Sequence, residues 1–474
     1  MTAPMNPTAG RRGRPVALLA GLLALAGCDG ILDVDEAGII VFEDVEAEGP
    51  TAVPALVAGV VGNYHELVDN IIRYAALLTD EMILAGTFED RLQVDRRRIQ
   101  VNNDVLTGAV YAPLHRTRMQ ADTTVFLLQE RLGDPAFADV EDDLREGIAF
   151  GKLYGGYARL WLGELYCWSI LTGMFPENRP LPPDERIVQA LGFLQEAETL
   201  AAIGGMEEIR FAAIVGQARA HLWLGNYSQA GTLAGDVPRD FVFDAEYSQN
   251  DPEQFNEMYM FTWGDMQQIR WTVGDGTATT RGSERWEHLD LFLDLELLRS
   301  EPEGFSAFSS SIPVTLQTLY GRADTGVLVA SGAEAMLIRA EAAVRAGRTG
   351  EAEALLNDLR SDYSLRTTIL RDVEPPDAAN ELAPLTLVGG LVPDLRTVAA
   401  ERARELWLTG DRMTTSRRLR RDPWSAIDLF PPVKTENSGG DDIAFPIPRL
   451  ELDNNPNLSA ADACPVGQAS GSWR

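Results

Sequence analysis

The sequence is poor in the residues that bind metals or form disulfides. It contains three Cys and four His among 474 residues. The histidines (His65, His115, His221 and His288) are too scattered for metal-ligand spacing, so we expect no metal site and no cofactor. Cys167 stands in an apolar stretch and is expected to be a buried thiol. A disulfide between Cys167 and Cys464 is the alternative in an oxidising compartment.

Basic residues are also scarce. The chain has 41 Lys and Arg against 71 Asp and Glu, which gives a formal net charge of −30. Such a chain repels phosphate backbones and anionic lipid headgroups, so nucleic acid is excluded as an expected partner. The acidic residues are spread along the chain, which is typical of a solvated surface and does not by itself define a ligand.

Long hydrophobic runs are missing as well. The apolar run 16–26 has about a dozen residues, whereas a membrane-spanning helix needs roughly 20. It follows three arginines and ends in Leu-Ala-Gly-Cys, which resembles a bacterial lipobox. We predict a lipoprotein signal peptide at 1–27, lipidation (palmitate included) of Cys28, and a linker at 28–50. An ordinary signal peptide, an N-terminal core helix or twin-arginine export through Arg11-Arg12 are the alternatives.

The sequence does contain strong helical periodicity. Apolar spacing predicts helices at 149–170 and 186–204, the second ending at a glycine pair. Residues 213–235 and 335–358 align with each other, since each has apolar residues four apart, then a glycine, then small residues. This pattern is typical of a tetratricopeptide-like hairpin, although other helical hairpins share it. We predict a mainly α chain, a tetratricopeptide-like α-α superhelix.

Between the two hairpins lies a segment of different composition. Residues 245–330 are rich in Gly, Ser, Thr and aromatic residues, which predicts a loop-rich insertion with a few short strands. Aromatic rings stack on the C–H faces of sugars, and polar side chains at the rim bind hydroxyls. Each aromatic residue alone is more often part of a core. The candidate ligand-binding residues are Trp263, Trp271, Trp286, Tyr247, Phe261, Phe88, Arg270, Asp265 and Gln267.

Several segments, in order along the chain, resemble one family. They are ILDVDE (31–36), LLTDEMILAGT (77–87), the helical stretch 110–130, AEAMLIRAEAAVRAG (333–347), ERARELWLTGDR (401–412) and FPIPRLELDNNPNL (445–458). Together they resemble the SusD/RagB family of outer-membrane nutrient-binding lipoproteins, and the last two segments carry most of the resemblance. Thr409 and Thr415 depart from the family pattern, in which acidic residues stand at these positions.

The resemblance implies a function and an organisation. It implies a single SusD/RagB-like domain at 51–474, with helical lobes at 51–244 and 331–474 on either side of the 245–330 insertion. It also implies a lipid-anchored outer-membrane protein, facing the cell exterior, that binds oligomeric nutrients such as glycans and delivers them to a SusC-like TonB-dependent transporter. No enzymatic activity is implied. Asp29, after the lipidated cysteine, leaves inner-membrane retention open.

Two late segments have simpler interpretations. Glu401, Arg404 and Glu405 have i,i+3 and i,i+4 spacing, which predicts structural ion pairing with an outside partner such as Arg412. The acidic, glycine-containing stretch 436–442 allows a calcium site, but it lacks EF-hand spacing, so a solvated turn is favoured.

Two other function classes remain open from the sequence. A helical repeat adaptor that scaffolds proteins would show the same hairpins. A lipid-anchored glycoside hydrolase is less favoured, since no G-x-S-x-G, H-E-x-x-H, P-loop or GxGxxG motif occurs. Paired catalytic carboxylates, however, leave no local sequence signature.

Overall fold

The computed structural model describes residues 49–173, 176–264, 270–273, 298–300, 315–317, 319–361, 382–430 and 440–459. Residues Gly49–Arg474 form one compact unit. The predicted signal peptide, Cys28 and nearly all of the predicted linker lie outside the described residues, as do Asp265, Gln267 and Trp286.

The fold is mainly α, as predicted. The longer helices are α2 (Val53–Leu78), α5 (Ala112–Arg131), α6 (Glu141–Leu165), α7 (Pro183–Gly204), α8 (Glu207–Trp223), α9 (Tyr227–Ala234), α13 (Gly332–Arg345), α14 (Thr349–Ser361), α16 (Leu391–Glu405) and α17 (Asp411–Arg421). Shorter helices are α3 (Glu89–Asp95), α4 (Asp104–Leu106), α10 (Glu257–Tyr259) and α18 (Arg449–Asn454). Single 3-10 or π turns are η1 (Gly49–Ala52), η2 (Thr107–Tyr111), η3 (Pro135–Val140), η4 (Pro252–Gln254) and η5 (Met260–Gly264).

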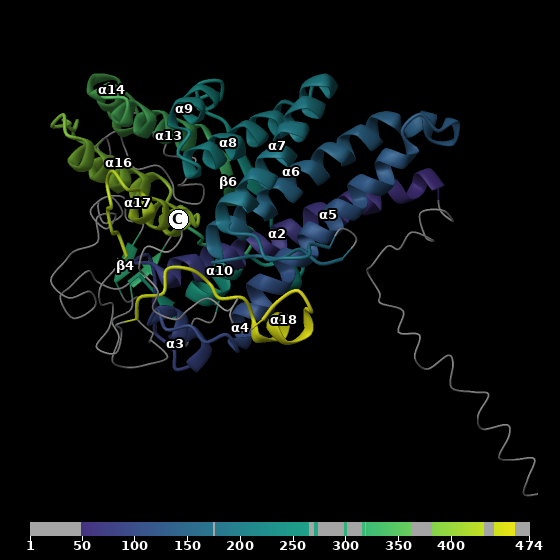
Figure 1. Ribbon diagram of the computed structural model, residues 1–474, viewed down its shortest axis with the longest axis horizontal. Coiled ribbons are helices and arrows are strands. Elements are labelled where there is room, and N and C mark those ends of the chain that lie inside the picture. The colour runs from purple at the N-terminus through teal and green to yellow at the C-terminus, as the bar shows by residue number, and fades with distance from the viewer. Residues whose placement is uncertain are drawn as a thin grey trace, which may run out of the picture. The chain divides into compact units, whose positions relative to one another are not determined.

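Helices α2, α5, α6, α7 and α8 pack side by side (Figure 1). Helix α6 is buried along most of its length because small residues let its neighbours approach. A Cβ atom on Gly151 would lie 2.5 Å from Val125 Cγ2 of α5. Helix α6 corresponds to the helix predicted at 149–170, but it begins at Glu141 and ends at Leu165. It ends there because Tyr166 turns into an extended conformation and forms a parallel β-bridge with Phe445.

Both predicted hairpins are present. Helices α8 and α9 turn at Gly225 (φ 78°), and α13 and α14 turn at Gly347 (φ 72°), a backbone conformation that favours glycine. The hairpins also pack against each other through α9 and α13. The second predicted helix also ends as expected, since Gly205 caps α7 in the left-handed conformation.

The strands are few and short. Within the described residues they form three two-stranded antiparallel sheets: β1 (Ile83–Leu84) with β3 (Trp271–Thr272), β2 (Val242–Ala245) with β6 (Val327–Ser331), and β4 (Leu298–Ser300) with β5 (Thr315–Gln317). The pairing of β2 with β6 joins the two ends of the aromatic-rich insertion, while β1 and β3 connect that insertion to the chain just after α2.

The chain near its C-terminal end packs over the helices. Phe445 and Ile447 are fully buried, and the Phe445 N–H donates to the Leu165 carbonyl at 2.8 Å. The proline-rich FPIP segment is therefore laid across helical neighbours, as its extended geometry predicts.

Two features concern the cysteine and membrane predictions. Cys167 is buried, as expected, but it is disulfide-bonded, so the expectation of a thiol at this position was wrong. Its bonding partner lies outside the described residues. Among the described helices, none is long and apolar enough to cross a membrane.

Candidate functional site

Four of the predicted ligand-binding residues come together beside α3: Phe88, Phe261, Arg270 and Trp271. The pairing of Leu84 with Trp271 places the insertion next to the segment that leads into α3, and the Ala85 N–H donates to the Arg270 carbonyl at 2.8 Å. Phe88 is the N-cap residue of α3 and is 54% exposed. This long-range strand pairing, which no local sequence pattern reveals, creates the site.

Phe261 is the centre of this group. The guanidinium carbons of Arg73, Arg91 and Arg270 lie 4.0, 4.7 and 5.9 Å from its ring centroid. Arg91 also lies 5.1 Å from the ring centroid of Phe88. We call Arg73, Phe88, Arg91, Phe261 and Arg270 the α3 cluster. Because guanidinium groups occupy the surroundings of Phe261, this ring holds arginines in place and is not a bare surface for a sugar.

Trp271 supports the cluster from the interior. Its side chain is fully buried, with its ring at 5.8 Å from Phe261 and 5.5 Å from Tyr74, both in edge-to-face geometry. We expected Trp271 to stack on a ligand, but a fully buried ring offers no face to one. Its apolar bulk instead fixes Phe261.

The other two described candidates are half-buried and bonded to the backbone. The Trp263 indole N–H donates to the Gln317 carbonyl at 2.5 Å, and the Tyr247 hydroxyl donates to the His65 carbonyl at 2.6 Å. His65 precedes Arg73 by eight residues on α2, roughly 12 Å along the helix axis. Tyr247 therefore contacts α2 about two turns before Arg73, whereas Trp263 lies two residues from Phe261 in the chain.

Arg91 differs from its neighbours in the cluster. Arg73 donates to Glu257 Oε2 at 2.5 Å and also bonds Asn70. Arg91 is half-buried, and no carboxylate or other acceptor among the described residues bonds its guanidinium; its Nε, like that of Arg73, is buried without a partner. Its guanidinium contacts the rings of Phe88 and Phe261. A charge placed this way has capacity left to bind an acceptor.

A polar cavity lies beside the same helix. It has a volume of about 450 Å³, within the range of small-molecule sites. The described residues that line it all have polar side chains: Glu89, Gln93, Arg96, Arg98 and Gln100. We call it the α3 cavity. Gln93 Oε1 is held by the Gln100 N–H and the Asn103 side chain, both at 3.1 Å.

Sequence reasoning missed Arg73, Arg91 and the whole α3 cavity. A signal for the cavity was present, because Arg96, Arg97 and Arg98 form a run of three arginines in a strongly acidic chain. The middle residue has a positive φ of 54° and contacts the Phe430 ring at 4.8 Å. This turn separates Arg97 from Arg96 and Arg98, which line the cavity.

The C-terminal segment holds the loop that follows α3. Asp442 Oδ2 accepts the Ile99 N–H at 2.6 Å, and the Arg449 N–H donates to the Val101 carbonyl at 2.6 Å. Asp442 belongs to the stretch considered for calcium, of which 436–439 lie outside the described residues. One of its carboxylate oxygens already bonds the backbone, and no metal-binding group of His, Cys, Asp or Glu occurs among the described residues.

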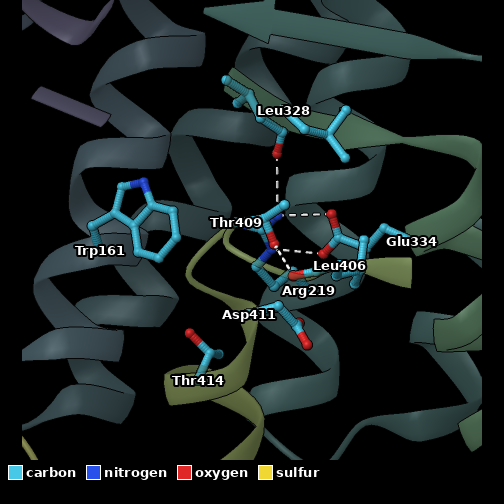
Figure 2. A pocket seen from close by; sticks show the side chains of 9 residues that line it. Trp161, Arg219, Leu328, Glu334, Leu406, Thr409, Asp411 and Thr414 are labelled. Atoms are coloured by element: carbon cyan, nitrogen blue, oxygen red, sulfur yellow. Dashed lines mark hydrogen bonds and ion pairs between the residues drawn. The ribbon is translucent and has the colours of Figure 1, made fainter. Parts of the chain in front are cut away.

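A second cavity lies in the interior and is shown in Figure 2. It measures about 10 Å³, so it holds at most a water molecule. Arg219 and Glu334 face each other in it, with two hydrogen bonds of 2.8 and 2.7 Å, and Arg219 also donates to the Val329 carbonyl. Thr409, Asp411 and Thr414 from the 401–412 motif and its neighbourhood complete the polar lining. This cavity is part of the core.

The 401–412 motif forms buried ion pairs. Arg402 pairs with Asp411, and Glu401 pairs with Arg404 and with Arg360 of α14. Arg412 does not join Glu401 as we expected; it forms two 2.8 Å hydrogen bonds with Asp80.

The motif thus joins the family-like segment 77–87. Glu81 Oε1 accepts the Leu408 N–H at 2.9 Å. Burial raises the pKa of Glu81 to about 8, and the hydrogen bond from Leu408 only partly opposes that shift. At Thr415, where the family pattern has an acid, the hydroxyl accepts from Arg402 and donates to Asp411.

Solved structures with the same architecture are numerous. A SusD-like carbohydrate-binding protein from Bacteroides vulgatus superposes with a TM-score of 0.62 at 14% identity, over 89% of this chain and 99% of that one. A SusD superfamily protein from Bacteroides thetaiotaomicron superposes with a TM-score of 0.61 at 13% identity, over 88% and 99%.

The chain has the SusD fold. A surface glycan-binding protein A from Bacteroides uniformis shares it with a TM-score of 0.55 at 13% identity, over 86% of this chain and 98% of that one. No family model and no curated protein sequence matches the chain. The resemblance inferred from six short motifs is therefore confirmed at the level of the fold. Comparison of whole sequences does not detect it, because the overall identity is too low.

Proposed function

We propose that this protein is a surface-exposed outer-membrane lipoprotein that binds oligomeric nutrients, principally glycans, and delivers them to a SusC-like TonB-dependent transporter. The SusD fold supports this proposal, since several proteins that share it are described as carbohydrate-binding or glycan-binding. The proposed binding site consists of the α3 cluster and the α3 cavity.

The observation that carries the site is the α3 cavity of about 450 Å³, whose lining residue Glu89 directly follows the exposed Phe88 in the chain. Its amide, guanidinium and carboxylate groups match the hydroxyl groups of a sugar, and Phe88 offers an apolar face for stacking. Binding of this kind requires positioned polar groups and a ring, and no reacting group.

The binding proposal is tested with a glycan panel. Full-length protein purified in detergent is screened by affinity gel electrophoresis against neutral and acidic polysaccharides, together with Phe88→Ala and Gln93→Ala. We expect both variants to weaken binding. Trp424→Ala is the matched control, because Trp424 is a 77% exposed aromatic residue in the turn after α17. If glycans bind but both site variants keep full affinity, the site assignment is wrong.

The anchor and the partner are tested separately. Cys28→Ala should move the protein from the membrane fraction to the soluble fraction, because the lipid is the proposed attachment. A protein that stays membrane-bound after this change contradicts the anchor. The delivery role predicts co-purification with a TonB-dependent transporter from native membranes, and capture of the protein without any transporter would favour a scaffolding role.

A further inference from the structure

Guanidinium groups gather on one part of a strongly acidic molecule. The chain carries a net charge of −30, yet Arg73, Arg91 and Arg270 surround one ring, and Arg96 and Arg98 line the α3 cavity. Glu89 is the one acidic member of the described cavity lining. The negative net charge of the whole molecule repels anions at long range. An anion that binds here must therefore be held by direct contacts with these arginine side chains.

Most of the well-buried arginines in the described part of the chain have a carboxylate partner. Arg219 has Glu334, Arg186 has Glu177 and Arg418 has Glu341. Burying a charge is costly unless it is paired, and a carboxylate is the acceptor that matches a guanidinium best. Arg91 has two ring contacts and no acceptor among the described residues.

The two rings hold Arg91 without consuming its hydrogen-bonding capacity. Interaction with ring faces stabilises a guanidinium electrostatically and leaves its N–H groups to bind a ligand. Phe88, on the solvent side, adds an exposed face beside the charge. A sugar ring that bears an acidic group offers both matching features, a C–H face and an anion.

Resting on the proposed function, we propose that the oligosaccharide ligand is anionic, with a carboxylate or sulfate group that binds Arg91. A neutral glycan would use the amides and the ring but would leave this guanidinium without an acceptor. Arg91 is then the residue that distinguishes acidic from neutral glycans. Arg73 does not have this role, because it is already bound to Glu257.

The test uses one sugar backbone in two charge states. Binding of oligogalacturonate and of its fully methyl-esterified form to the full-length protein is measured by calorimetry, with a sulfated chondroitin oligosaccharide as a third probe. We expect an acidic probe to bind more tightly than the ester, with an affinity that falls as salt rises. Chondroitin also carries a carboxylate, so the unsulfated oligosaccharide is measured beside it. Tighter binding of the sulfated form than of the unsulfated form assigns sulfate as the anion and also supports the proposal.

The variants identify the residue responsible. Arg91→Gln should weaken binding of the acidic probe about tenfold to hundredfold and leave the ester unchanged, since a hydrogen bond to a charged group contributes about 1.5–3 kcal/mol. Arg91→Lys should retain part of the affinity. Arg348→Gln removes the same charge from an exposed position in the α13–α14 turn and should change nothing.

The outcomes separate this inference from the function on which it rests. Equal affinity for the ester and for both acidic probes, or an Arg91→Gln variant with unchanged preference for the acidic probe, overturns the inference while glycan binding stands. If no neutral or acidic glycan binds, both fail, and binding of an acidic peptide in their place would reassign the ligand class.

Discussion

Two arginine-rich regions of this molecule have opposite surroundings. Each of the five arginines of α17 has an acceptor: Arg412 bonds Asp80, Arg418 bonds Glu341, Arg420 and Arg421 bond Asp428 and Asp184, and Arg417 bonds backbone carbonyls. Arg91 of α3 has aromatic rings as neighbours and no acceptor among the described residues. The number of arginines in a segment therefore does not indicate the role of that segment. The groups to which the arginines bond indicate whether they are structural or available for binding.

The electrostatics of the α17 region agree with a structural role. Burial alone would raise the pKa of Glu341, but the guanidiniums of Arg418 and Arg345 outweigh it and lower that pKa to about 2. The carboxylate is therefore charged at all ordinary pH values and is held between two α-helices, α13 and α17.

Breaking a pair in the α17 region should give the largest effect. Asp80→Ala leaves Arg412, which is 5% exposed, without the carboxylate that forms two hydrogen bonds with it. We expect a loss of about 3–5 kcal/mol in the free energy of unfolding, measured by urea denaturation. Arg348→Ala, which breaks an exposed pair, should cost at most about 1 kcal/mol. Equal losses in the two variants would contradict the structural role of the Asp80–Arg412 pair.

The buried carboxyl groups that are charged and those that are neutral should affect stability in opposite directions as the pH changes. Burial raises the pKa values of Asp69 and Glu81 to about 8 and of Glu164 to about 7. Because these folded-state values exceed the ordinary ones, their contribution to stability is present below about pH 4 and lost as pH rises through 7 to 8. Glu341, with its lowered pKa, acts in the opposite sense and loses its contribution only near pH 2.

We therefore expect the free energy of unfolding to fall by several kcal/mol between pH 6.5 and pH 8.5, since each group contributes about 1.4 kcal/mol per pH unit below its folded-state pKa. Thermal melts across this range measure it. Glu81→Gln should flatten the dependence, because the amide is neutral at every pH and its oxygen still accepts the Leu408 N–H. A stability that rises over this range would show that these carboxyl groups are charged in the folded protein.

Removing the central ring should test what holds the α3 cluster together. Phe261→Leu keeps an apolar side chain but loses the ring beside Arg73 and Arg91. We expect a loss of about 1–2 kcal/mol in unfolding free energy, together with weaker glycan binding. Full binding affinity in this variant would show that the ring does not position Arg91.

The smallest expected effect on stability is that of Arg91→Gln. No ion pair among the described residues is broken and only the two ring contacts are lost, so the free energy of unfolding should fall by at most about 1 kcal/mol. Arg418→Gln, the same chemical change in α17, should cost several times more because Glu341 loses two hydrogen bonds. Similar losses from the two substitutions would remove the contrast between the regions.

The sequence predicts the helical part of this structure well. The turns at Gly225 and Gly347, the end of α7 and the buried FPIP segment all follow from local spacing and backbone chemistry. The end of α6 does not, because it depends on Tyr166 pairing with Phe445, far away in the chain.

The site was only partly predictable for the same reason. Composition indicated Phe88, Phe261, Arg270 and Trp271, but only the pairing of β1 with β3 shows that Trp271 is inside and Phe88 outside. The importance of Arg91 could not be predicted from the sequence, because it depends on the lack of an acceptor beside this side chain, which only the structure shows.

A crystal structure of the protein with a bound acidic oligosaccharide tests the central claim most directly. We predict that the ligand's carboxylate or sulfate lies within hydrogen-bonding distance of the Arg91 guanidinium, with a sugar ring against Phe88, while the ion pairs of α17 are unchanged. A ligand bound elsewhere, or one that leaves Arg91 without an acceptor, would contradict the claim that this arginine is kept for binding.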